Sequence, residues 1–195
     1  MRNKLRCKCD VNVVYLFKMK VKNMKPELGT CYYPEHWPRE LWGQDAKKMA
    51  DLGLKIVRIG EFAWSRLEPS PGIFTFDWMD QAVDILGEQG LNVVMCTPTA
   101  TPPRWMLDKY PDMLAVDENG YARKFGSRRH YCFSHDGYRE ESVRIARLVA
   151  ERYSSHQAVS AWQIDNEYGC HDTVVSYSDA AVSYTHLTLP TILLV

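Results

Sequence analysis

The sequence predicts an α/β fold, and two observations support this. Short apolar stretches alternate along the chain with longer segments whose apolar residues have helical spacing. The apolar stretches are continuous, as expected for parallel strands that are buried on both faces. Strands and helices in alternation predict a parallel sheet with crossover helices. With 195 residues, the chain is long enough for one sizeable core and one domain.

The elements follow one another from residue 26. Strands are predicted at 28–33, at 54–59 (LKIVRI), at 91–97 (LNVVMCT) and at 158–164. Helices are predicted at 39–51, 77–90 and 136–153, and a fourth begins at 178–182. The first helix ends before Gly53, a residue typical of helix C-termini. A long loop with four prolines is predicted at 98–135.

The loops after the strands distinguish between two α/β architectures. A doubly wound sheet would carry a glycine-rich first turn for a nucleotide, but the first turn is YYPEHWP, and neither G-x-G-x-x-G nor a P-loop occurs. A (β/α)₈ barrel places its chemistry on the loops that follow its strands. Polar, aromatic-rich loops do follow them: PEHW, GEFAWSRLEP, TPTATPPRW and DNEYG. We therefore predict a partial (β/α)₈ (TIM) barrel with about four of the eight strand–helix units.

The two ends of the chain are predicted to lie outside this unit, which extends over 26–182. Residues 1–25 have a basic start and a short apolar run interrupted by Asn12. They are interpreted as a poorly ordered leader, with a signal peptide as the alternative. The Thr- and Leu-rich segment 183–195 is interpreted as a non-native tail from a broken coding sequence. The alternative for this segment is an apolar C-terminal strand.

The composition excludes several classes of protein. The chain has 24 basic and 24 acidic residues, so its net charge is zero. It therefore has no excess of positive charge that would favour binding to nucleic acid or to an anionic membrane. No apolar run is long enough to span a membrane. The six cysteines form no C-x-x-C pair, which argues against a zinc ribbon or a disulfide scaffold and indicates buried, reduced thiols in a cytoplasmic protein. The six Trp residues suit sugar rings as well as a core.

The stretch AVSAWQIDNEYG, residues 158–169, places polar side chains at the end of an apolar strand. A barrel strand directs its last side chains into the active-site mouth, so Asn166 and Glu167 are expected to meet a ligand there. Trp162 and Tyr168 flank them. A carboxyl group that is partly desolvated at this place has its pKa raised toward neutrality, which suits a group that donates and then removes a proton. Glycoside hydrolysis needs such a group, with a second carboxylate about 5 Å away when configuration is retained.

Two charged residues near the second strand have a structural interpretation. Arg58 lies inside the apolar stretch IVRIG and therefore needs a buried anionic partner. Glu61, in GEFAW, either points into the mouth of the barrel or forms a structural salt bridge. We favour the salt bridge.

Five stretches together closely resemble the N-terminal half of the catalytic barrel of glycoside hydrolase family 42, the bacterial β-galactosidases. They are GTCYYPEHWP, GLKIVRIGEFAWSRLEPSPGIFTFDWMD, CTPTATPPRWM, GSRRHYCFSH and AWQIDNEYGCHDT, and the resemblance extends from residue 28 to about residue 182. The resemblance implies that Glu167 is the acid/base catalyst and that Asn166 hydrogen-bonds the sugar 2-hydroxyl. It also implies that Arg128 contacts galactose and that Arg58 supports the nucleophilic carboxylate.

The sequence departs from the family pattern in two ways. The family's nucleophile is a glutamate after the seventh strand; it is absent from this chain, and neither Glu61 nor Glu68 replaces it. Some relatives bind a structural zinc through four cysteines, of which Cys132 matches one. Serines stand where further thiolates would be needed, at 176 and 178, so no metal is expected. Neither Cys170 nor His171 is expected to restore the site.

The chain is interpreted as a fragment of a retaining β-galactosidase, a hydrolase of carbohydrate metabolism that releases terminal non-reducing β-D-galactose. The fragment alone is expected to be inactive. The resemblance implies a galactoside substrate and no cofactor, and the family often forms trimers. Two alternatives stay open: a catalytically inert, sugar-binding half-barrel, and a glycosidase of the same clan that acts on a β-glucoside, mannoside or arabinoside. The loop GSRRHYCF favours galactose because it matches the galactosidases.

Overall fold

The computed structural model describes residues 26–126, 129–168 and 175–192. Its sheet contains β1 (Gly29–Cys31), β2 (Ile56–Ile59), β3 (Asn92–Cys96) and β4 (Val159–Gln163). The longer helices are α1 (Arg39–Asp51), α3 (Asp77–Glu88), α5 (Asp136–Tyr153) and α6 (Asp179–Ile192). Short helices occupy the loops: η1 (Pro34–His36), α2 (Trp64–Leu67), η2 (Pro98–Ala100) and α4 (Trp105–Lys109).

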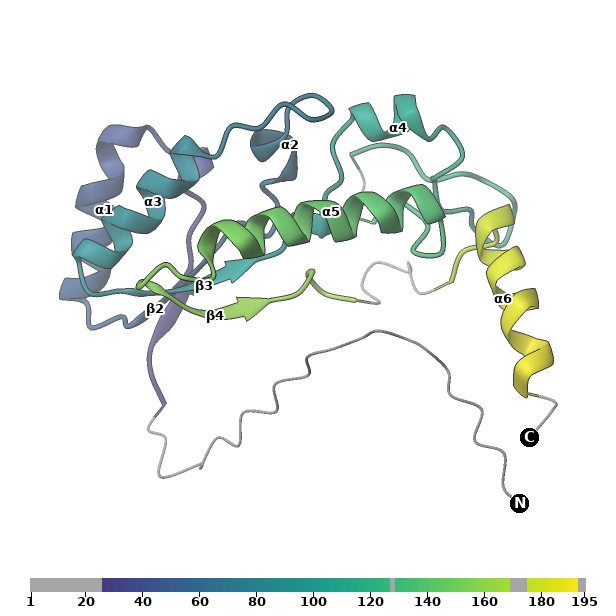
Figure 1. The fold of residues 1–195 in the computed structure, drawn as a ribbon. Helices are drawn as coiled ribbons and strands as arrows, with labels where there is room; N and C mark the ends of the chain where they lie inside the picture. Colours follow the sequence, from purple (N-terminus) through teal and green to yellow (C-terminus); the bar gives the residue numbers. More distant parts are fainter. Residues whose placement is uncertain (1–25, 127–128, 169–174, 193–195) are drawn as a thin grey trace, which may run out of the picture.

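The sheet has parallel strands in the order β1-β2-β3-β4, so each strand pairs with the next one along the chain. Figure 1 shows α1, α3 and α5 on one side of this sheet. Parallel strands in chain order, joined by helices on one side, form the arrangement of half a (β/α)₈ barrel. The predicted α/β fold and partial TIM barrel are therefore confirmed.

The outer strands are more exposed than predicted. All three residues of β1 are exposed, and so are the three central residues of β4, 160–162. The prediction of strands buried on both faces is wrong for these two, because they lie at the two edges of the described sheet. Cys31, on β1, is exposed for the same reason, whereas the thiols of Cys96 and Cys132 are buried as predicted.

The two segments predicted to lie outside the barrel unit are only partly described. Residues 1–25 lie outside the described residues. The segment that begins at 183 is helical as far as Ile192, as part of α6, so the alternative of a C-terminal strand is wrong. Its non-native origin stays a prediction. Across the described ranges, no helix is long and apolar enough to cross a membrane.

The core lies between the sheet and the helices. The strand residues that contribute to it are Val57, Ile59, Val93 and Met95, all fully buried. Because side chains alternate along a strand, the residues between them face the opposite side of the sheet. Strand pairing places Cys31, Arg58, Val94, Cys96, Ala161 and Gln163 on this second face. It is the face that would line the inside of a closed barrel.

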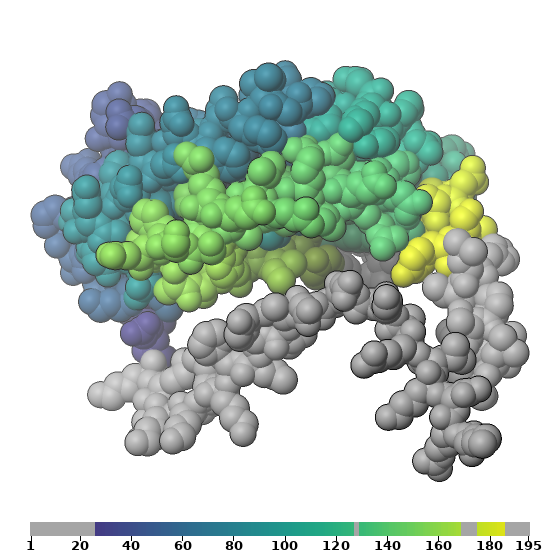
Figure 2. Space-filling view, viewed as in Figure 1, coloured from purple at the N-terminus to yellow at the C-terminus, as the bar shows by residue number. Residues whose placement is uncertain are grey.

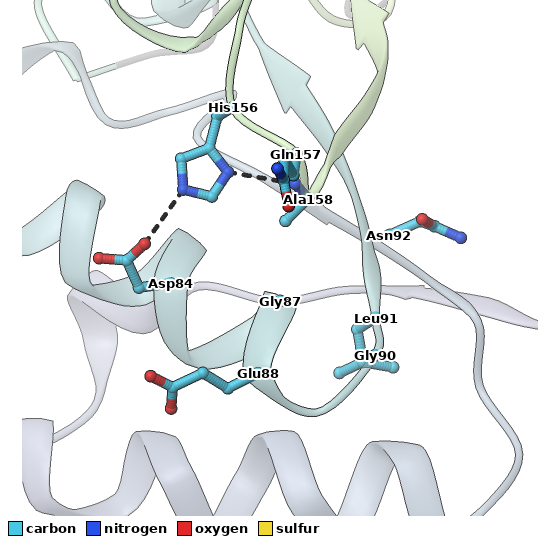
Figure 3. A pocket seen from close by; sticks show the side chains of 9 residues that line it. All are labelled: Asp84, Gly87, Glu88, Gly90, Leu91, Asn92, His156, Gln157 and Ala158. Atoms are coloured by element: carbon cyan, nitrogen blue, oxygen red, sulfur yellow. Dashed lines mark hydrogen bonds and ion pairs between the residues drawn. The ribbon is translucent and has the colours of Figure 1, made fainter.

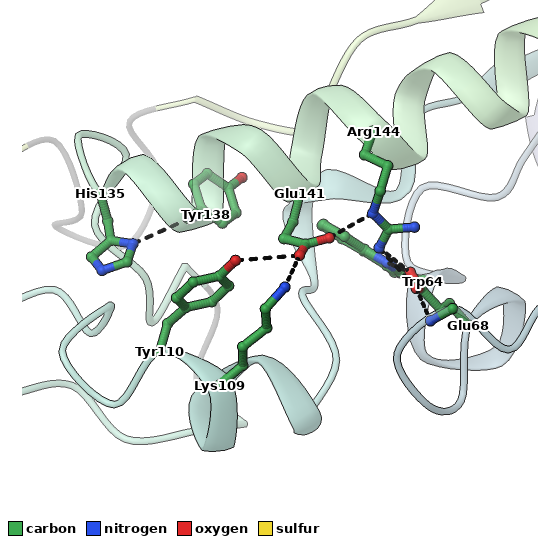
Figure 4. A network of polar contacts seen from close by, with 9 residues as sticks. Trp64, Glu68, Lys109, Tyr110, His135, Tyr138, Glu141 and Arg144 are labelled. Carbon is green, nitrogen blue, oxygen red and sulfur yellow. Dashed lines mark hydrogen bonds and ion pairs between the residues drawn. The ribbon is translucent and has the colours of Figure 1, made fainter.

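A buried polar network fastens α5 to the loops after β2 and β3 (Figure 4). The fully buried carboxylate of Glu68 accepts hydrogen bonds from Trp64 Nε1 at 3.0 Å and from Arg144 Nη2 at 2.7 and 2.8 Å. Arg144 also donates to Glu141, as does Lys109, each at 2.6 Å. Burial raises the pKa of Glu141, but these two hydrogen bonds outweigh it and hold the pKa below its usual value. The network thus ties two loops at the carboxyl end of the sheet to one rigid helix.

Two helical glycines give a matched test of the packing. A Cβ on Gly137 of α5 would lie 2.5 Å from Cε1 of Tyr110, whereas one on Gly43 of α1 would meet nothing within 4 Å. The Tyr110 ring is also held by a hydrogen bond from its hydroxyl to Glu141. We expect Gly137→Ala to lower the free energy of unfolding by about 1–3 kcal/mol through overpacking. We expect Gly43→Ala to raise it by about 0.5–1 kcal/mol. Urea unfolding measures both, and equal effects would contradict the packing.

Candidate active site

The turn after β4 brings Asn166, a predicted sugar contact, and Glu167, the predicted acid/base catalyst, to the carboxyl end of the sheet. Asn166 is buried, with 8% of its surface exposed. Asp165 and Glu167, on either side of it, have φ values of +57° and +51°, a region that non-glycine residues rarely adopt. Among the described residues, the third such residue is Arg129, with φ +52°. Strained backbone of this kind gathers at functional sites, which supports the placement of the site at this turn.

Asp165 fixes the turn to its surroundings. Its carboxylate, in a residue that is 3% exposed, accepts hydrogen bonds from Thr99 Oγ1 at 2.8 Å and from Arg129 Nη2 at 3.0 Å. It also accepts from the backbone N–H of Asn166 at 2.6 Å. The backbone N–H of Asp165 donates to Thr97 Oγ1 at 2.8 Å. The loop after β3 and the loop that contains Arg129 therefore both hold the β4 turn.

Arg129 is the buried partner of Asp165. It is 2% exposed, and its guanidinium lies over the rings of Phe133 and Tyr168 at 5.3 and 5.2 Å. The preceding residue, Arg128, is the predicted galactose contact, and it lies outside the described residues. The predicted role of Arg128 therefore stays a prediction, although its neighbour is fastened to the turn that carries Asn166.

The predicted buried partner of Arg58 is confirmed. Arg58 Nη2 lies 2.8 Å from Oε1 of Glu61, a fully buried carboxylate that also accepts a hydrogen bond from the Tyr33 hydroxyl at 2.9 Å. Burial lowers the pKa of Arg58, but the charge of Glu61, together with smaller contributions from Cys31, Tyr33 and Cys96, outweighs burial and raises the pKa, so the guanidinium stays charged. Burial, followed by the charge of Glu61, raises the pKa of the nearby Cys96 thiol to about 12. This thiol is therefore neutral near pH 7 and unsuited to act as a nucleophile.

Glu167 is exposed, so the predicted shielding of its carboxyl group is not found in the described residues. The reason is its position: β4 is the edge strand, and its atoms and those of the following turn lie at the surface below α5 (Figure 2). Tyr168, the aromatic neighbour, is exposed as well. The assignment of Glu167 as acid/base catalyst stays a prediction.

A hollow of about 410 Å³ at the opposite end of the sheet is a separate feature (Figure 3). His156 Nε2 lies 3.1 Å from Asp84 Oδ1, and His156 Nδ1 accepts a hydrogen bond from the backbone N–H of Ala158. The hollow lies at the amino ends of β3 and β4, next to Leu91. Because barrel chemistry takes place at the carboxyl ends of the strands, this hollow is not the candidate active site.

The region matched to a zinc site in relatives holds hydroxyl groups that bond to one another. Ser176 Oγ donates to Ser178 Oγ at 3.0 Å and accepts from the backbone N–H of Val116 at 3.2 Å. Cys132 is the thiol of this region, and it is buried. Within the described ranges, no three His, Cys, Asp or Glu side chains are placed to hold a metal ion. One thiol with two serines does not fit a tetrahedral thiolate site. Cys170 and His171 lie outside the described residues.

Comparison with known proteins identifies the family. The family model for glycoside hydrolase family 42, described as beta-galactosidase, matches residues 31–187. The chain belongs to glycoside hydrolase family 42. A beta-galactosidase of Thermus thermophilus is 59% identical over 150 residues, which cover 77% of this chain and 23% of that protein.

Solved structures of family members agree with this assignment. The beta-galactosidase of the psychrophilic Marinomonas ef1 is 54% identical, with a TM-score of 0.82 over 84% of this chain and 25% of that one. The enzyme of the haloarchaeon Halorubrum lacusprofundi is 52% identical, with a TM-score of 0.77 over 80% of this chain and 23% of that one. The family 42 chain described here thus spans about a quarter of the length of these relatives. The resemblance seen in the sequence is confirmed.

Three residues of the candidate site were not predicted from the sequence. Asp165 precedes the Asn–Glu pair, Arg129 is the second arginine of GSRRH, and Gln163 ends β4. Asp165 and Arg129 are each next to a residue that was assigned a role, and Gln163 lies close before Asn166 in the sequence. That proximity is the signal that could have found them, but their partners lie in distant parts of the chain.

Proposed function

We propose that this chain is the part of a retaining β-galactosidase that supplies the acid/base catalyst, Glu167, and two sugar contacts, Asn166 and Arg128. The turn after β4 supports the proposal most strongly. It holds Asn166 and Glu167 at the carboxyl end of a barrel strand, in a strained backbone that the buried pair of Asp165 and Arg129 fixes.

In this proposal Glu167 protonates the glycosidic oxygen while the bond from that oxygen to the anomeric carbon breaks. The nucleophile is a carboxylate expected after the seventh strand of the barrel, beyond the four strands of the described sheet, and it forms an ester with the anomeric carbon. Water then gives a proton to Glu167, attacks the same carbon and releases galactose with retained configuration. Because Glu167 is exposed here, the desolvation that raises a catalytic pKa has to come from the substrate and the remaining barrel.

The same assignment leads to proposals for the substrate, the cofactor, the cellular location and the partners of the enzyme. The names of the relatives support a galactoside substrate, and no step of the proposed reaction uses a cofactor. Free thiols at Cys31, Cys96 and Cys132 support a reducing, cytoplasmic location. We propose no nucleic acid or membrane partner, and a trimer for the full-length enzyme.

A chimera tests the proposal. In the Thermus thermophilus relative, the 150 matched residues are replaced by those of this chain. We expect the chimera to hydrolyse an aryl β-galactoside with a kcat/KM about 100-fold or more above that for the aryl β-glucoside, because a site that hydrogen-bonds a hydroxyl rejects the wrong configuration. A folded chimera without galactosidase activity would contradict the proposal, and a preference for the glucoside would favour the other substrate class.

The inert half-barrel is tested on the 195-residue chain itself. The chain alone is expected to be inactive on the same aryl β-galactoside, because it lacks the nucleophile. Turnover by this chain that Glu167→Gln abolishes would show that it is an enzyme on its own.

A further inference from the structure

A chain of hydrogen bonds crosses the second face of the sheet and ends at Asn166. Arg58 Nη1, on β2, donates to Oε1 of Gln163, on β4, at 2.8 Å. Gln163 Nε2 donates to Asn166 Oδ1 at 3.1 Å and to the backbone carbonyl of Asp165 at 2.8 Å. At the other end, Arg58 is held by the buried carboxylate of Glu61. This series of hydrogen bonds therefore extends from the loop after β2 to the turn after β4.

The donors and acceptors in this series of hydrogen bonds can be arranged in only one way. The oxygen and nitrogen of a side-chain amide are hard to tell apart from their positions alone. A guanidinium group only donates, so the atom of Gln163 that faces Arg58 must be the oxygen. A backbone carbonyl only accepts, so the atom that faces the Asp165 carbonyl must be the NH₂ group of Gln163. Both neighbours give the same orientation.

The fixed orientation of Gln163 in turn fixes that of Asn166. The NH₂ group of Gln163 points at the side-chain amide of Asn166. The atom of Asn166 that accepts this hydrogen bond must therefore be its oxygen. The nitrogen, Asn166 Nδ2, is then turned away from Gln163. A ligand on the side that faces away from Gln163 therefore meets the NH₂ group of Asn166, which only donates.

We propose that Gln163 is a positioning residue that makes Asn166 a hydrogen-bond donor toward the sugar 2-hydroxyl. The inference rests on the proposed function, which assigns the 2-hydroxyl to Asn166. Gln163 acts through Asn166, and Arg58, anchored by Glu61, sets the direction of the whole chain of hydrogen bonds. Arg58 thus has a positioning role toward Gln163. This role is separate from the support of the nucleophile that the family resemblance implies.

The substitution Gln163→Glu tests the orientation with almost no change of shape. A carboxylate at this position keeps the contact with Arg58, but it accepts only and has nothing to donate to Asn166. The Asn166 amide is then expected to turn over, giving its NH₂ group to the new carboxylate and its oxygen to the ligand side. Gln157→Glu is the matched control, because Gln157 is an exposed glutamine at the opposite end of β4.

Side-chain amide hydrogen exchange, measured by NMR on the ¹⁵N-labelled 195-residue chain, reads the orientation without any sugar. In the parent we expect the protected side-chain amide to be that of Gln163. In Gln163→Glu we expect the exchange of the Asn166 NH₂ group to slow by about ten-fold, and in Gln157→Glu to stay as in the parent. Unchanged Asn166 exchange in a folded Gln163→Glu chain would overturn the inference. If that variant does not fold, protection of Asn166 Nδ2 instead of Gln163 Nε2 in the parent would overturn it.

The chimera links the orientation to the substrate. Gln163→Glu is expected to lower kcat/KM for the β-galactoside by about 10- to 100-fold, the loss expected when a donor is replaced by an acceptor facing the 2-hydroxyl. It is expected to leave kcat/KM for the 2-deoxy analogue within about three-fold, since that substrate lacks the hydroxyl. Equal losses on both substrates would overturn the donor role. A chimera that is inactive before any substitution, with the orientation confirmed by exchange, would count against the proposed function alone.

Discussion

Glu167→Gln in the chimera is expected to lower kcat/KM for an alkyl β-galactoside by about 10²–10⁴-fold. The amide keeps the size of the side chain but has no acidic proton, so the poorly leaving alkoxide departs without protonation. For an aryl β-galactoside with a good leaving group, bond cleavage needs little acid assistance. The remaining defect is then the loss of the base that activates water, so the intermediate accumulates and KM falls with kcat.

Two further measurements make this result specific for Glu167. Added azide, a nucleophile that needs no general base, is expected to restore turnover of the aryl substrate in the variant and to yield galactosyl azide. Glu151→Gln is the control, because Glu151 is an exposed residue in the last turns of α5. We expect it to leave both substrates unaffected. An equal loss of activity on alkyl and aryl substrates, without azide rescue, would contradict the acid/base assignment.

Arg129→Met is expected to lower the free energy of unfolding of the 195-residue chain by about 3–5 kcal/mol. The side chains of Arg129 and Asp165 are 3% and 4% exposed, so solvent screens their interaction very little. Methionine occupies a similar volume but leaves the Asp165 carboxylate buried without its counter-charge. Urea unfolding followed by circular dichroism measures the change.

The surface control for this substitution is Arg147→Met. Arg147 is an exposed residue of α5, and we expect its replacement to change the free energy of unfolding by no more than about 0.5 kcal/mol. Adding Asp165→Asn to Arg129→Met is expected to cost less than the sum of the two single changes, because the neutral amide no longer needs a counter-charge. Additive effects, or an Arg129→Met chain as stable as the control, would contradict the buried pair.

The regular elements were predictable from sequence because their signals are local. Continuous apolar runs and helical spacing put each of β2, β3, α1 and α5 within about two residues of its observed bounds. The exposure of β1 and β4 was not predictable in this way, because it depends on which strands form the edges of the sheet. The helices α2 and α4 have four and five residues, too few for a periodic pattern.

The candidate site was predictable only in part, for a related reason. The Asn–Glu pair at the end of β4 is visible in one short stretch of sequence. The contacts that position it are not, since Arg58 and Gln163 are 105 residues apart, and Thr99 and Asp165 are 66 apart. A polar residue in a loop has the same local signature whether it meets water or a buried partner. Which of the two it meets is decided by tertiary structure.

The exposed outer strands have a consequence for the behaviour of the chain in solution. Along the outer side of β4, and of β1, the backbone of the described sheet offers N–H and C=O groups to any other polypeptide. Nothing in the sequence of β4, VSAWQ, blocks such pairing, because it contains neither proline nor a charged side chain. Light scattering is therefore expected to rise steeply with protein concentration, and the substitution Ala161→Lys is expected to delay the onset.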